Sequence, residues 1–99
     1  MFVHHVYFWL KNPESKEDLA ALKAGLETLK LGIEPKILAH IGTVALTNRS
    51  VIETTYALSW LMLFSNTEDQ DAYQTHPVHK KFIEECSHLW EKVIVYDSI

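Results

Sequence analysis

The sequence predicts one α+β domain, residues 1–99, with four strands and two helical regions in the order βαββαβ. The segments Phe2–Lys11 and Thr54–Phe64 are rich in the β-branched and aromatic residues that favour strands. Leucines recur at helical spacing between them, over residues 19–29. A chain of 99 residues is also long enough for one hydrophobic core and short for two.

The first strand and the first helix are separated by Asn12-Pro13, which ends the strand. Ser15 is suited to cap the helix, with Asp18 completing an approximate capping box. Gly32 ends the helix. One face of the helix carries a stripe of leucines that must pack on the sheet: Leu19, Leu22, Leu26 and Leu29.

The middle of the chain predicts two further strands. Ile37–Leu46 forms the second strand, with Gly42 as a bulge. The polar run Thr47–Ser50 turns the chain into the third strand, Thr54–Phe64.

The last third predicts a broken helix and a closing strand. Thr67 and Gln70 form a capping-box pair that opens a short helix, and His76-Pro77 breaks it. Pro77 suits the first position of a second helical piece. Val93–Asp97 is the fourth strand. This order is the ferredoxin-like arrangement, a four-stranded antiparallel sheet with both helical regions on one face.

The other face of the sheet is predicted to pack against a second copy of the chain. A half-exposed strand alternates apolar and polar residues, but here both alternate sets of the first strand are apolar. These sets are Phe2, Val6, Phe8 and Leu10, and Val3, Tyr7 and Trp9. No loop is long enough to cover such a face, so we expect a symmetric homodimer formed sheet to sheet, a dimeric α/β barrel. We expect the set with Val6 and Phe8 to face the partner.

Composition and charge favour a cytoplasmic protein that binds neither nucleic acid nor membrane. Thirteen acidic and nine basic residues give a net charge of −4, and Lys80-Lys81 is the only basic pair. The longest apolar stretch, Tyr56–Phe64, is too short to span a bilayer. Cys86 is the only cysteine, which excludes an internal disulfide and favours a reducing compartment.

The six histidines do not have the spacing of a metal site. His4 and His5 are adjacent on a strand and therefore point to opposite faces. His76 and His79 are separated by Pro77, and no acidic residue falls on the same apolar faces. We expect neither a metal nor another cofactor.

His79 is the best candidate for a functional side chain. It begins the helical stripe completed by Phe82, Ile83 and Cys86, so it faces the sheet, and burial should lower its pKa below the ordinary value of about 6.5. Tyr73, His5 and Trp90 are expected to project toward the same region. Such a lining, without a carboxylate, suits a flat apolar ligand or proton transfer next to a carbonyl. An empty volume above roughly 300 Å³ would favour binding over a packed core.

Three segments resemble the stress-responsive dimeric α/β-barrel (Dabb) family: Val3–Trp9, Ala72–His79 and Leu89–Asp97. The Tyr-x-x-His-Pro-x-His element from Tyr73 to His79 and the final strand are the most specific parts. The resemblance extends over essentially the whole chain. It implies a ferredoxin-like fold whose sheets pair into a barrel.

Within that family the chain is distantly similar to plant olivetolic acid cyclase, which closes a linear tetraketide by aldol condensation without a cofactor. The similarity implies that His79 is the base, that Tyr73 assists it and that His5 supports the site. Leu58 stands where the cyclase has a further histidine.

Three functions therefore stay open at this point. The first is a dimer that binds a small hydrophobic or aromatic molecule, with or without cofactor-free proton transfer. The second is a structural, stress-related dimer whose histidines and tyrosine are core groups. The third is a cofactor-free monooxygenase or haem-handling enzyme of the wider dimeric barrel group.

Overall fold

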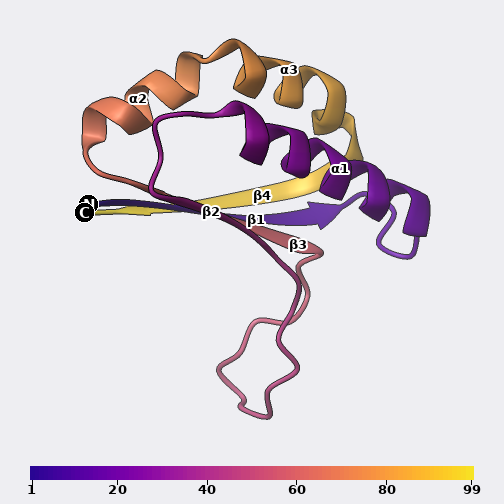
Figure 1. The fold of residues 1–99 in the computed structure, drawn as a ribbon. Helices are drawn as coiled ribbons and strands as arrows, with labels where there is room; N and C mark the ends of the chain where they lie inside the picture. The colour runs from indigo at the N-terminus through magenta and orange to yellow at the C-terminus, as the bar shows by residue number, and fades with distance from the viewer.

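The computed structural model describes residues 1–99. The chain folds into a four-stranded antiparallel sheet that is covered on one face by helices (Figure 1). The strand order is β2-β3-β1-β4. The elements are β1 Phe2–Leu10, α1 Lys16–Gly32, β2 Leu38–Gly42, β3 Leu58–Phe64, α2 Thr67–Thr75, α3 Pro77–Cys86, the 3₁₀ turn Ser87–Leu89 and β4 Trp90–Ser98. The predicted ferredoxin-like fold is confirmed.

The helices begin at side-chain caps. The backbone N–H of Asp18 donates to Ser15 Oγ at 3.1 Å, as the sequence predicts, and the leucine stripe of α1 lies in the core. The cap of α2 is Asn66, whose Oδ1 accepts from the backbone N–H of Asp69 at 2.8 Å. The predicted capping pair of Thr67 with Gln70 is therefore wrong by one residue. The amide oxygen of Asn66 accepts from a free N–H of the first turn, so the helix begins after Asn66.

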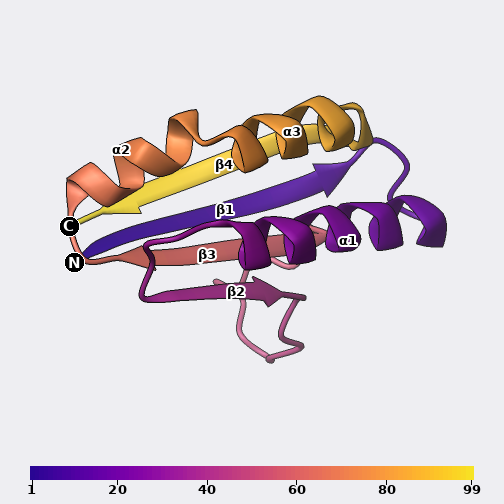
Figure 2. The same ribbon diagram turned by 45° about the horizontal axis from the view of Figure 1, so that its top comes forward.

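His76 joins α2 to α3 and has a structural role. Its backbone N–H donates to the Tyr73 carbonyl oxygen at 3.1 Å, and its Nδ1 accepts from the backbone N–H of Val78 at 3.1 Å. Pro77 occupies the first turn of α3, as predicted. The two helices run along the β4 side of the sheet, and α1 lies over the β3 side (Figure 2).

The connection between β2 and β3, residues 43–57, is longer than predicted because both strands are shorter. It extends away from the sheet on the side opposite the helices (Figure 1). It returns to the sheet where the backbone N–H of Ala57 donates to the Phe8 carbonyl oxygen at 2.7 Å and Trp9 Nε1 donates to Thr55 Oγ1 at 2.8 Å. The loop thus covers only one end of the bare face. Gly42 ends β2 instead of forming a bulge.

The two faces of the sheet are assigned by burial along β1. Val6 and Phe8 are 5% and 3% exposed beneath the helices, so their predicted orientation toward a partner is wrong. The alternate set that includes Tyr7 and Trp9 lies on what we call the open face. Its strand residues are Val3, His5, Tyr7, Trp9, Leu38, His40, Ser59, Leu61, Leu63, Lys92, Ile94, Tyr96 and Ser98. Because both sets are apolar, alternation alone could not show which one the helices cover.

None of the helices combines the length and the hydrophobicity that crossing a membrane requires.

Candidate functional site

A cavity of about 200 Å³ lies between the helix-covered face of the sheet and the helices α2 and α3. We call it the histidine pocket. Its lining residues are His4, Val6, Phe8, Trp60, Tyr73, Gln74, His79, Phe82, Ile83, Trp90, Val93 and Val95. The volume is below the roughly 300 Å³ that would favour binding over a packed core, and only a small molecule fits. Val93 and Val95, on the edge strand β4, are 42% and 48% exposed, which leaves this side of the pocket accessible.

His4 and Asp97 form a hydrogen-bonded pair in this region. They lie directly opposite each other on β1 and β4, and His4 Nδ1 is 2.6 Å from Asp97 Oδ1. His4 is only 5% exposed. An ionised carboxylate can only accept, so Nδ1 of His4 carries the proton that is donated to Asp97. We expected no carboxylate near the site, and Asp97 corrects that.

Tyr73 stands between the two imidazoles of the pocket. Its ring centre is 5.7 Å from that of His4 and 4.4 Å from that of His79. Trp60 Nε1 donates to the Tyr73 hydroxyl oxygen at 3.3 Å. Burial raises the pKa of Tyr73 well above its ordinary value, although the bond from Trp60 opposes the shift. The phenol therefore stays protonated and can donate a hydrogen bond to a ligand.

His79 is held by the backbone of the preceding helix. Its Nδ1 is 3.2 Å from the carbonyl oxygen of Gln74, which can only accept, so Nδ1 carries the proton. Burial lowers the pKa of His79, the bond to Gln74 opposes this, and the nearby His4 and His76 lower the pKa further. The direction agrees with the sequence-based expectation. A neutral His79 with a free Nε2 can accept a proton.

The structure brings Tyr73, His79 and Trp90 together as predicted, but it places His5 on the open face. There the hydroxyl of Tyr7 lies 3.1 Å from His5 Nδ1. The neighbouring His4 takes the place expected of His5. His4 belongs to the set of β1 side chains that the helices bury. The sequence does not reveal which set is buried, so it could not identify His4 as the pocket residue.

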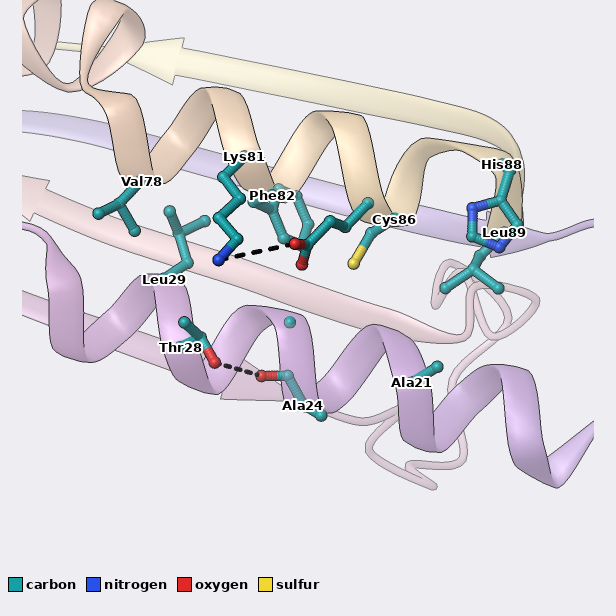
Figure 3. A pocket seen from close by; sticks show the side chains of 12 residues that line it. Ala21, Ala24, Thr28, Leu29, Val78, Lys81, Phe82, Cys86, His88 and Leu89 are labelled. Atoms are coloured by element: carbon teal, nitrogen blue, oxygen red, sulfur yellow. Dashed lines mark hydrogen bonds and ion pairs between the residues drawn. The ribbon is translucent and has the colours of Figure 1, made fainter.

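A larger groove, of about 520 Å³, lies between α1 and α3 (Figure 3). Gly25 lets the helices approach, since a Cβ there would be 2.6 Å from Cys86 Sγ. Lys81 and Glu85 form an ion pair of 3.7 Å at its edge, and burial raises the pKa of Cys86. No hydrogen bond joins the thiol to His88 or Glu85 of the same groove, so the groove lacks an activated nucleophile and the histidine pocket is the better candidate.

No group of three or more histidine, cysteine, aspartate or glutamate side chains is arranged to hold a metal ion.

The family model of the stress-responsive A/B barrel domain (Dabb) matches residues 2–99. No curated protein matches the chain. Among solved structures, an Arabidopsis thaliana protein is 24% identical with a TM-score of 0.81, covering 100% of this chain and 94% of its own. A dimeric ferredoxin-like protein of unknown function from Thermobifida fusca is 13% identical with a TM-score of 0.78, covering 98% and 88%. A hydroxynitrile lyase from Passiflora edulis is 19% identical with a TM-score of 0.78, covering 99% and 91%. At these identities the likeness shows the fold alone.

Proposed function

The chain belongs to the stress-responsive A/B barrel domain family, and we propose that its histidine pocket binds a small, mainly apolar carbonyl compound and transfers a proton on it without a cofactor. One observation carries the proposal: His4, Tyr73 and His79 converge on a single small cavity with apolar walls. An imidazole can act as a general base, and a phenol that stays protonated can donate a hydrogen bond to an oxyanion.

In the proposed reaction, Nε2 of His79 removes a proton from the carbon next to the carbonyl group. The electron pair of the broken C–H bond moves toward the carbonyl oxygen, which becomes an enolate oxygen. The hydroxyl of Tyr73 donates a hydrogen bond to this oxygen, while its own oxygen keeps the bond from Trp60. The His79 imidazolium then returns the proton to the substrate.

His4 is the positioning partner in this proposal. Its bond to Asp97 fixes the orientation of the imidazole beside Tyr73.

The hydroxynitrile lyase of Passiflora edulis supports this class of chemistry. Cleaving a hydroxynitrile into a carbonyl compound and cyanide requires a base that removes the hydroxyl proton. The substrate proposed for the present chain is similarly small, because the histidine pocket holds only about 200 Å³.

A homodimer formed through the open face is the proposed assembly. Leu61 and Leu63 are half-buried on this face and Tyr96 is 63% exposed, so a monomer leaves a large apolar surface in water. The dimeric protein from Thermobifida fusca has the same fold. A second copy presents the same mainly apolar surface and is a matching partner.

A structural role without catalysis is the second candidate. It is favoured by the absence of any buried side-chain nitrogen or oxygen atom without a hydrogen-bond partner. In that case His4, Tyr73 and His79 would stabilise the core and bind no ligand.

Deuterium exchange decides between these functions. Acetophenone, an aromatic methyl ketone, is incubated in D₂O with the protein, and loss of its methyl proton signal is followed by NMR. We expect exchange above the buffer rate that disappears in His79→Ala, while His88→Gln, at an exposed position, behaves as the parent. If the parent neither accelerates exchange nor shows shifts at pocket residues with a panel of small aromatic ketones and aldehydes, the structural role stands.

A further inference from the structure

The open face carries a row of ionisable side chains that the histidine pocket does not use. His5 of β1 and His40 of β2 are both paired with Leu61 of β3, so the two imidazoles flank this leucine on one face. Since neighbouring strands are roughly 5 Å apart, the two histidines are separated by roughly 10 Å. Tyr96 of β4, paired with His5, continues the row.

No strand of the sheet places a carboxylate on this face. Asp97 points to the other side, where it accepts from His4. The ammonium of Lys92 lies 4.5 Å from the centre of the Trp9 ring, and Glu53 of the 43–57 loop lines the hollow at this same end. The remaining ionisable groups around His5 and His40 are phenols: Tyr7, Tyr56 and Tyr96. A positive charge on the row therefore has no acidic partner in the strands.

His5 is suited to the neutral form in this environment. The Tyr7 hydroxyl lies 3.1 Å from its Nδ1 and can donate to it or accept from it, so this contact is satisfied when His5 is neutral. Burial lowers the pKa of His5, and the nearby His40 and His4 lower it further. Covering the face with a second copy removes more water from the ring and acts in the same direction.

We propose that the open face is an interface for a second copy of this chain that separates when His5 and His40 become protonated. This inference rests on the dimer proposed above. In a two-fold dimer four imidazoles, two from each copy, share one layer of the interface. A neutral imidazole can be buried in this layer, whereas an imidazolium there has no acidic strand partner and needs water.

The sign of the effect follows from linkage. A histidine whose pKa is lower in the dimer than in the monomer binds its proton preferentially in the monomer. Association is therefore strongest above the monomer pKa and weakens as the pH falls. Each histidine whose pKa is one unit lower in the dimer weakens association about tenfold at pH values below both pKa values.

Sedimentation velocity at pH 7.5 and 5.5 tests the inference on the full chain. We expect the dimer dissociation constant of the parent to rise about tenfold or more at the lower pH. The double variant His5→Gln and His40→Gln should show little change between the two pH values. The control His88→Gln removes an exposed histidine outside the open face and should respond as the parent does. Near-UV circular dichroism separates dissociation from unfolding.

A parent dimer of equal strength at both pH values overturns the inference, and so does a double variant that dissociates in acid as the parent does. If the double variant fails to fold, His40→Gln alone replaces it, because the His40 side chain is exposed and makes no hydrogen bond in the monomer. This variant should lose part of the acid response, and an unchanged response overturns the inference. A parent that is monomeric at pH 7.5 overturns the proposed dimer as well, while the exchange assay reports separately on the pocket.

Discussion

His4 and His5 are neighbours on β1, yet they lie on opposite faces of the sheet in different chemical surroundings. His4 is almost fully buried, donates to Asp97 and borders the histidine pocket. His5 is half-buried and lies beside Tyr7, and none of the paired strand residues on its face is a carboxylate. A carboxylate stabilises the imidazolium, and its absence disfavours it. The same residue type therefore has a carboxylate partner on one face and a phenol partner on the other.

The apolar residues of β3 differ between the faces in a similar way. Trp60 and Met62, beneath the helices, are at most 1% exposed, so this chain alone completes their burial. Leu61, between them on the open face, is only half-buried in the monomer. Substitutions on the covered face should thus affect folding, whereas those on the open face should affect association.

The largest expected effect comes from placing a charge on each face in turn. Val6→Lys buries an unpaired ammonium and should cost several kcal/mol, on the order of the whole stability of a domain this size, so the variant should be largely unfolded. Leu61→Lys should fold and remain monomeric. Thermal melting and sedimentation check both, with Leu31→Lys, at an 84% exposed position of α1, as control. A folded monomeric Val6→Lys beside a dimeric Leu61→Lys would reverse the assignment of the faces.

The sequence predicts the order of elements because each depends on local chemistry. Ser15, Pro77 and the leucine stripe of α1 all act within a few residues of their position. The orientation of β1 could not be predicted in the same way, since Phe2–Leu10 is apolar on both alternate sets. The length of the 43–57 loop could not be predicted from local sequence either, because strand ends depend on which neighbouring backbone groups pair.

The residues of the candidate site differ in the same way: those close in the sequence could be predicted to lie together, and those far apart could not. Tyr73 and His79 are six residues apart on either side of the break at His76-Pro77, so the two side chains are brought together by a local turn of the chain. His4 and Asp97 are separated by 93 residues, and only the register of β1 against β4 brings them together. Register depends on pairing across the whole sheet, which no single segment encodes.

The next largest effect concerns catalysis in the histidine pocket. His79→Ala removes the proposed base and should lower the acetophenone exchange rate by about 10²- to 10⁴-fold. Tyr73→Phe removes the donor to the enolate oxygen and should lower the rate less, by at most about 10²-fold. Both variants should stay folded in circular dichroism, and His5→Gln, on the open face, should keep the parent rate. A His5→Gln variant that loses exchange would place the chemistry on the other face.

A smaller effect is expected from the His4–Asp97 pair. Asp97→Asn removes the charge of the acceptor, and because the carboxylate is 41% exposed we expect a loss of only about 1 kcal/mol in the free energy of unfolding. Urea denaturation measures this, and Glu91→Gln, an exposed position of the same strand, is the control. The double variant with His4→Gln should lose little beyond His4→Gln alone, because the two residues share one interaction. Additive losses would show that the pair is not coupled.

The smallest expected effect is the change in folding stability as the pH falls. It compares one histidine from each face of the sheet, His79 and His5. Burial lowers the pKa of both His79 and His5, so each binds its proton more weakly in the folded than in the unfolded chain. Their contribution to stability is present above the unfolded value of about 6.5 and is lost as the pH falls through the folded pKa. NMR titration of the imidazoles should place both pKa values below 6.5, and dilution to the monomer should raise that of His5 while leaving that of His79 unchanged. A His79 that titrates at 6.5 or above would contradict the lowered pKa that its burial causes. If dilution leaves the pKa of His5 unchanged, the open face stays in water. The two faces would then differ only in their burial within a single chain.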